Sequence, residues 1–347
     1  MRVLVTGGNG FIGSYVCSAL RNADHEPLSF DHHYHPRSGE TFLGSVTDST
    51  AVTDAAAHVD GIIHLAAVLG TQETISNPRP AAEVNVIGSI NVFEAAVQYD
   101  LPIVYVGVGN HWMREQGAGS YTISKTCAED FARMYHQYRG ARISVVRPVN
   151  AYGPGQSVAS PFGSSKVRKI TPAFVCRALC GMPIEVYGSG NQVSDMIYVA
   201  DVARTMVAAL GSGHFGPFGV GPLESHTVND VAHMIEREVY RGQGAPPIVN
   251  LPMRPGEVAE AKVTADTSEL DKIGIDPARF VSLEHGIAET VAWYQEHEGA
   301  TWHRPAGIEL TRVLDQQTRL DQCRERDECC MPGCAEPHFP YCEHHDV

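Results

Sequence analysis

Apolar and polar positions alternate with two different periods along the first 150 residues. Short runs rich in apolar residues predict strands at residues 2–6, 26–30, 61–65, 103–107 and 143–147. Longer stretches with helical periodicity lie between them, at residues 11–23, 80–99 and 120–138. Buried strands that alternate with helices are typical of a parallel sheet covered on both faces. The pattern therefore predicts the α/β class, with a Rossmann-type doubly wound parallel sheet.

The pattern changes after residue 150, where Pro and Gly become frequent and the segments less regular. We expect a first domain over residues 1–150 and a smaller C-terminal lobe over 151–298, interleaved with the core. The spacing of apolar residues at 282–297 predicts a final amphipathic helix in that lobe. Residues 299–322 are interpreted as a linker or a peripheral helix, and residues 323–347 as a separate tail rich in cysteine.

Composition and charge narrow the class of protein. The 347 residues are 43% hydrophobic and 19% charged, which is typical of a globular protein and not of a disordered chain. A formal net charge of -14 repels nucleic acid and anionic membrane surfaces, so we expect neither as a partner. No apolar stretch approaches the ~20 residues that span a bilayer, and the chain runs from Met1 straight into a strand. We expect a cytoplasmic protein.

Three glycines mark the turn between the first strand and the first helix. Gly7, Gly10 and Gly13 stand in the run T-G-G-N-G-F-I-G, which directly follows the strand and opens the helix. Such a turn lets the backbone approach a pyrophosphate, while the helix N-terminus supplies N–H donors. A tight strand-to-helix turn without a ligand is the alternative. The position of the glycines favours a dinucleotide site.

A carboxylate at the end of the second strand indicates which dinucleotide binds. Asp31 lies about 20 residues after the loop, where it can accept hydrogen bonds from both adenosine ribose hydroxyls. A role as a plain turn residue is the alternative. NADP would need cations here, yet residues 32–35 are His, His, Tyr and His, and Arg37 is the nearest arginine. The sequence therefore favours NAD as the cofactor.

A phenol and an ammonium group share one face of the helix predicted at 120–138. Tyr121 and Lys125 are four residues apart, which brings their side chains together. A cation near the phenol lowers its pKa, so that tyrosine can exchange a proton with a substrate hydroxyl during hydride transfer. Lys125 could also hold the nicotinamide ribose. The pair occurs by chance in many helices, and its weight comes from the glycine loop before it.

These motifs and several later ones resemble the extended short-chain dehydrogenase/reductase family, over roughly residues 1–300. The family includes the NAD-dependent nucleotide-sugar epimerases and dehydratases. Further matching runs are I-H-L-A-A at 63–67, N-V-I-G-S-I-N at 85–91, R-P-V-N-A-Y-G-P-G at 147–155, Y-G-S-G at 187–190, Y-V-A-D-V-A at 198–203 and R-P-G-E at 254–257.

The resemblance implies roles for particular residues. It places Asn150 and Arg254 at the diphosphate of a nucleotide-sugar substrate, with Val108 beside that substrate; a turn residue and a surface cation are the alternatives for the first two. It also implies a homodimer in which the helices at 85–99 and 120–138 pair. The residues that it implies for cofactor binding, beside the glycines, Asp31 and Lys125, are Phe11, Ile12, Leu65, Ala66, Ala67, Asn85 and Pro148.

The chain departs from the family in three places. Val108 stands where the family has a serine or threonine that orients the substrate, so we expect Asn110, Ser120 or Thr122 to supply the missing hydrogen bond. Gly109 and Asn110 replace the acidic pair of the dehydratases, which disfavours dehydration. Ser194 and Ser45 replace, respectively, an arginine that contacts phosphate and an aspartate that meets adenine.

The tail carries cysteine and histidine at spacings typical of zinc ligands. We expect Cys329, Cys334, Cys342 and His345 to bind a structural Zn²⁺, with Cys330 and His344 as possible substitutes. A disordered tail with incidental cysteines is the alternative.

Together these features predict an NAD-dependent epimerase, or a related oxidoreductase, of nucleotide-activated sugars. Tyr121 would act as acid and base, supported by Lys125, with Asn110 as the auxiliary hydrogen-bonding group. The competing hypothesis is a non-catalytic NAD-binding sensor or interaction module that docks through the zinc tail. The substitution at Val108 favours the sensor, and the retained Tyr121 and Lys125 favour the enzyme.

Overall fold

A computed structural model describes residues 1–34, 39–70, 73–116, 119–158, 167–254 and 257–297. All of them belong to one compact unit, which extends from Met1 to Trp302. The predicted linker at 299–322 and the predicted zinc ligands Cys329, Cys334, Cys342 and His345 lie outside the described residues. Among the described residues, no three His, Cys, Asp or Glu side chains gather in a way that could hold a metal ion.

A seven-stranded sheet forms the centre of this unit, and every pair of neighbouring strands in it is parallel. The order across the sheet is β11-β6-β5-β4-β1-β2-β3. The chain leaves β1 for β2 on one side and later returns to β4 on the other, so the loops after β1 and β4 meet at a topological switch point. The strands are β1 (Arg2–Thr6), β2 (Glu26–Asp31), β3 (Thr41–Leu43), β4 (Gly61–His64), β5 (Ile103–Val106), β6 (Ile143–Pro148) and β11 (Phe218–Val220).

The strands are buried on both faces of the sheet, which explains why apolar residues predominate in them. Alternate residues of β1 point to opposite sides: Leu4 belongs to one hydrophobic core, and Val3 and Val5 belong to the other. All three side chains are fully buried. Two cores, one on each face, therefore hold the sheet between two layers of helices.

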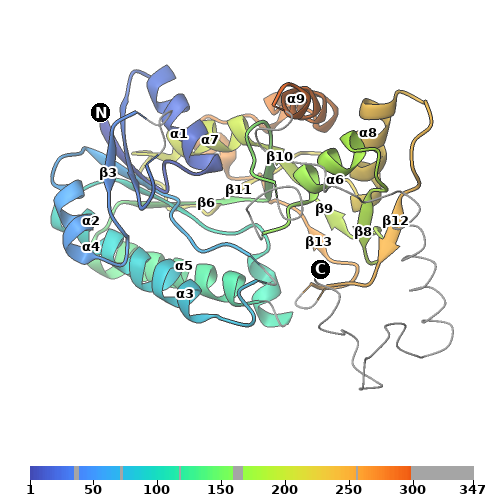
Figure 1. The fold of residues 1–347 in the computed structure, drawn as a ribbon. Helices are drawn as coiled ribbons and strands as arrows, with labels where there is room; N and C mark the ends of the chain where they lie inside the picture. Colours follow the sequence, from blue (N-terminus) through green and yellow to red (C-terminus); the bar gives the residue numbers. More distant parts are fainter. Residues whose placement is uncertain (35–38, 71–72, 117–118, 159–166, 255–256, 298–347) are drawn as a thin grey trace. The chain divides into compact units, whose positions relative to one another are not determined.

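The helices form these two layers (Figure 1). The first core is covered by α2 (Ser49–Ala56), α4 (Ser89–Gln98) and α5 (Ser120–Arg139). The second core is covered by α1 (Phe11–Asn22) and α7 (Val199–Ala209), which pack against each other. This arrangement is the doubly wound α/β fold expected from the sequence pattern.

A smaller C-terminal lobe follows the sheet. Its helices pack on one another, and its three short strand pairs, β10–β7, β12–β8 and β13–β9, are all parallel. Its helices are α6 (Ile170–Leu179), α8 (Val228–Tyr240) and α9 (Leu283–Glu296). Its strands are β7 (Asn150–Tyr152), β8 (Glu185–Tyr187), β9 (Val193–Ser194), β10 (Met196–Tyr198), β12 (Val249–Leu251) and β13 (Lys262–Val263).

The structure adds elements that the sequence pattern did not predict. The short edge strand β3 and helix α2 fill the interval before β4, and β11 and α7 join the sheet from beyond residue 150. The first 150 residues therefore do not contain the whole sheet. The single helix predicted at 80–99 is divided into α3 (Arg79–Ala82), the π-helical segment η1 (Glu83–Gly88) and α4.

Three short 3₁₀ segments complete the described chain, namely η2 (His111–Gln116), η3 (Leu270–Ile273) and η4 (Pro277–Arg279). None of the helices among the described residues is both long enough and apolar enough to cross a membrane.

Candidate active site

The glycine loop joins β1 to α1 at the switch point of the sheet. Gly7 adopts a positive φ of 72°, which disfavours any residue with a side chain. A Cβ on Gly13 would overlap the carbonyl oxygen of Gly7 and lie 2.7 Å from the Cα of Gly8. Gly10 precedes α1 without a side-chain cap, so the first turn keeps its N–H groups available. These features fit the phosphates of a dinucleotide.

Asp31 ends β2 beside the glycine loop, and its side chain is only 10% exposed. Its carboxylate accepts hydrogen bonds from the backbone N–H of Asn9 (3.1 Å) and of His33 (3.2 Å). The carboxylate is thus fixed at the end of the strand, where the remaining lone pairs can accept ribose hydroxyls. The geometry fits the role that the sequence predicts for Asp31.

A buried histidine holds the loop that carries Leu65, Ala66 and Ala67. The hydroxyl of Thr6 accepts hydrogen bonds from the N–H groups of Leu65 and Ala66, so it must donate to His64 Nδ1, 2.6 Å away. The ring proton of His64 therefore lies on Nε2, which contacts the hydroxyl of Ser89 at 3.0 Å. Burial, followed by the charge of Lys125, lowers the pKa of His64 to about 3. His64 is a neutral structural link at neutral pH.

Asn85 holds the same loop from the π-helical segment η1. Its side-chain oxygen accepts from the N–H of Val68 (2.8 Å), and its amide group donates to the carbonyl of Val68 and to the hydroxyl of Ser124. Asn85 is fully buried. These contacts support a positioning role for Asn85, between the cofactor loop and helix α5.

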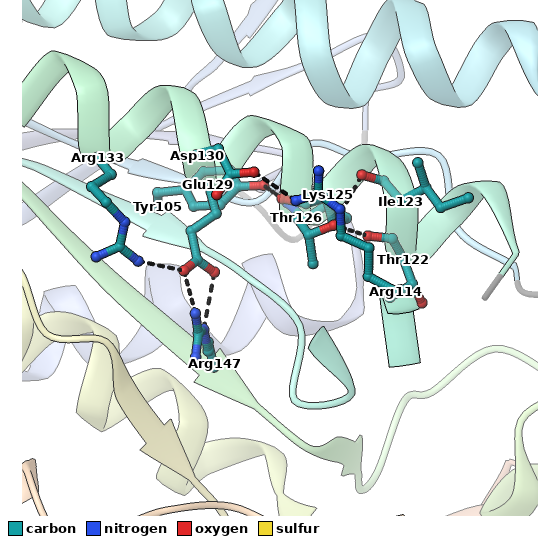
Figure 2. Close-up of polar contacts among 10 residues, drawn as sticks. All are labelled: Tyr105, Arg114, Thr122, Ile123, Lys125, Thr126, Glu129, Asp130, Arg133 and Arg147. Atoms are coloured by element: carbon teal, nitrogen blue, oxygen red, sulfur yellow. Dashed lines mark hydrogen bonds and ion pairs between the residues drawn. The ribbon is translucent and has the colours of Figure 1, made fainter. Parts of the chain in front are cut away.

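Tyr121 and Lys125 lie one turn apart at the start of α5, as the sequence predicts. Lys125 is 2% exposed, and its Nζ lies 4.3 Å from the centre of the Tyr105 ring. Tyr105 in turn donates its hydroxyl to the backbone oxygen of Lys125 (2.8 Å), a contact drawn in Figure 2. Burial lowers the pKa of Lys125 to about 7 and raises that of Tyr121 to about 12. The expected lowering of the phenol pKa is therefore not found, because burial disfavours the charged form of both groups.

Glu129 continues the same helix face one turn beyond Lys125, and its charge opposes the lowering of the lysine pKa. Glu129 is buried and receives hydrogen bonds from two nitrogens of Arg147, through Nε at 3.0 Å and through Nη2. Arg133 lies 3.7 Å from the same carboxylate (Figure 2). Sequence reasoning missed this ion pair; the four-residue spacing of Lys125 and Glu129 indicated only that Glu129 shares a helix face with Lys125.

The segment after β5 contains the main departure from the family. Val108 is 5% exposed and brings no hydroxyl group. Of the three proposed substitutes, Ser120 donates its hydroxyl to the carbonyl of Thr74 (2.6 Å), and Thr122 is buried. Asn110 lines a cavity of the C-terminal lobe. The geometry thus favours Asn110 as the group that faces a ligand.

This cavity gathers cations around an aromatic ring. The guanidinium of Arg254 lies 4.7 Å from the centre of the Tyr187 ring and pairs with Glu257. Arg168 donates to the Tyr187 hydroxyl (2.6 Å). Other lining residues that matter for ligand binding are Lys169, Gln192 and Ser194. An excess of cations beside an aromatic face suits an anionic ligand that carries a ring.

Asn150, the other residue expected at the diphosphate, is exposed and lies next to the cavity. Its amide group donates to the hydroxyl of Ser194 (2.9 Å) and to the carbonyl of Asp195 (3.0 Å). Ser194 itself lines the cavity. The structure therefore brings Asn150 to the cavity edge, with both amide hydrogens in use.

Comparison with known proteins agrees with this geometry. The profile of the NAD dependent epimerase/dehydratase family matches residues 3–221. A putative UDP-glucose 4-epimerase of Methanocaldococcus jannaschii is 27% identical over 317 residues, which cover 85% of this chain and 99% of that protein. A UDP-N-acetyl-alpha-D-glucosaminuronate decarboxylase of Bacillus cytotoxicus is also 27% identical, over 86% of this chain and 98% of its own length.

Solved structures are similar over the same part of the chain. UDP-glucose 4-epimerase of Thermus thermophilus in complex with NAD is 28% identical, with a TM-score of 0.73 over 85% of this chain and 99% of that one. The Thermotoga maritima UDP-glucose 4-epimerase with UDP-glucose is 25% identical, with a TM-score of 0.75 over 85% and 99%. This chain therefore belongs to the NAD dependent epimerase/dehydratase family, and NAD is the cofactor of that family.

Proposed function

We propose that the protein is an NAD-dependent epimerase, or a closely related oxidoreductase, of a nucleotide-activated sugar. The observation that carries the proposal is that Tyr121 and Lys125 stand four residues apart on one face of α5, with the lysine side chain buried. A protein that only binds NAD has no need of a buried lysine one helical turn from a tyrosine. The relatives with the same fold include epimerases, which supports this direction.

Tyr121 takes the proton of a sugar hydroxyl and later returns it. NAD⁺, when bound, supplies the hydride acceptor for the same carbon. The phenol has to lose its proton at neutral pH although burial raises its pKa, so the positive charge of Lys125 must stabilise the phenolate. Glu129 favours the charged form of Lys125 and thereby supports this step.

The cavity of the C-terminal lobe is the proposed site of the nucleotide diphosphate. Arg254 can form paired hydrogen bonds with phosphate oxygens, and Arg168 and Lys169 add positive charge on the same side. Asn110 lines the cavity and, in this proposal, supplies the hydrogen bond that Val108 cannot make. Asn150 lies at the cavity edge, and because both of its amide hydrogens are in use, its side-chain oxygen would accept a hydrogen bond from a substrate hydroxyl. Because Gly109 and Asn110 replace the acidic pair of the dehydratases, we propose epimerisation and not dehydration.

A panel of UDP-, GDP- and dTDP-sugars, incubated with the pure protein and NAD, tests this proposal. We expect epimerised or oxidised product from at least one sugar, and a loss of ~10²-fold or more in turnover for Tyr121→Phe. Tyr138→Phe is the matched control, because Tyr138 is 81% exposed at the far end of the same helix. Full activity of Tyr121→Phe would show that Tyr121 is not the acid and base of the reaction.

A second candidate function is a non-catalytic NAD-binding sensor, and the apolar Val108 is the observation that favours it. In that case NAD binds, but none of the nucleotide sugars binds or is converted. Calorimetric titration of the same panel separates the two functions, since it detects binding without turnover.

We also propose that the protein forms a homodimer through the helical surfaces of η1, α4 and α5. Ile87 on η1 and Ile123 on α5 are 51% and 47% exposed, and η1 and α5 contact each other, so the two elements together offer apolar surface to a partner. Pairing of these helices between two copies would cover both side chains.

A further inference from the structure

A histidine from the segment after β5 faces the ion pair of Arg147 and Glu129. His111 begins the 3₁₀ segment η2, and its Nε2 lies 3.1 Å from Nη1 of Arg147. A guanidinium group only donates hydrogen bonds, so Nε2 must be the acceptor and the ring proton must lie on Nδ1. His111 can hold Arg147 only as a neutral imidazole, because the protonated ring has no acceptor.

The local sequence makes space for this arrangement. A Cβ on Gly107 would lie 2.9 Å from Oε2 of Glu129 and 3.2 Å from Cγ of Arg147. The bare backbone at Gly107 therefore lets the ion pair approach the end of β5. Arg147 then joins helix α5, through Glu129, to the segment after β5, through His111.

The same segment presents Asn110 to the cavity. Asn110 directly precedes His111, so the bond between His111 and Arg147 limits the movement of the Asn110 backbone. We propose that His111 is a positioning residue, which accepts a hydrogen bond from Arg147 and so keeps Asn110 directed at the substrate. The inference rests on the proposed function, in which Asn110 contacts the sugar nucleotide.

The charged groups around His111 determine how acid affects its hydrogen bond with Arg147. Arg147 faces it from β6 and binds Glu129 on α5; Arg133 lies 3.7 Å from the Glu129 carboxylate, and Lys125 also feels the charge of Glu129. Burial, followed by the charge of Arg147, lowers the pKa of His111, and Glu129 opposes this effect. Protonation would remove the acceptor and place a second cation against Arg147. Acid should therefore release the segment and lower activity.

Two substitutions at His111 test the inference with the nucleotide sugar that the wild type converts. His111→Leu removes the acceptor, and we expect kcat/KM to fall on the order of tenfold while NAD affinity and thermal midpoint stay near wild type. His111→Gln retains an acceptor that does not titrate, so it should recover most of kcat/KM and lose the acid limb of the pH profile. His58→Leu is the matched control, because His58 is exposed beyond the end of α2.

Wild-type kcat/KM and an unchanged pH profile in His111→Leu would overturn the inference. Equal impairment in His111→Leu and His111→Gln would also overturn it, since that outcome indicates packing and not hydrogen bonding. ¹⁵N NMR, assigned by comparison with His111→Gln, gives a readout without turnover: we expect a neutral ring protonated on Nδ1, and protonation on Nε2 contradicts the contact. If the wild type converts no nucleotide sugar, the proposed function fails, and the NMR result still decides whether His111 holds Arg147.

Discussion

The buried His64 makes stability depend on pH in a way that can be measured. Between its folded pKa of about 3 and its ordinary value of 6.5, the unfolded chain binds a proton that the folded chain does not. Stability therefore falls as pH falls from 6.5 towards 3. At pH 5, which is 1.5 units below 6.5, the free energy of unfolding is lower by 1.5 × 1.36 kcal/mol, or ~2 kcal/mol. Because pH 5 lies well above the folded pKa, this loss depends only on the pKa of the histidine in the unfolded chain.

The substitution His64→Gln keeps a donor and an acceptor but removes the titrating group. Urea denaturation at pH 7, 6 and 5 should show that wild type loses ~2 kcal/mol more than His64→Gln over this range. His58→Gln is the control, because it makes the same replacement at an exposed histidine. Equal pH dependence in wild type and His64→Gln would refute the reasoning, since it would mean that His64 titrates normally in the folded protein.

Three further predictions concern the cofactor site and the helical surface. Gly13→Ala should weaken NAD binding by more than about tenfold in calorimetry, because its Cβ would overlap the carbonyl of Gly7; unchanged affinity would argue against a tight cradle. Asp31→Asn should reduce the affinity for NAD by roughly tenfold and make the protein prefer NAD over NADP less strongly, measured by competition binding. An unchanged preference for NAD would show that Asp31 does not recognise the ribose. Ile123→Asp should give a monomer in light scattering, and a wild type that is itself monomeric contradicts the proposed pairing.

Local sequence was sufficient to predict the layered α/β fold and the position of the cofactor loop. Both follow from short-range physics: buried parallel strands must be apolar on both faces, and a glycine turn needs residues without a Cβ. Spacing along one helix was likewise enough to place Tyr121 beside Lys125.

Contacts between distant segments were decided only by the tertiary structure. The sequence does not show that β11 completes the sheet, that Asn85 holds the loop at Val68, or that Arg147 joins Glu129 to His111. Nor could spacing show that burial would raise the pKa of Tyr121, because desolvation depends on everything packed around a group. Short-range patterns report what a residue prefers, whereas its partners and its dielectric surroundings come from chain segments that only folding brings together.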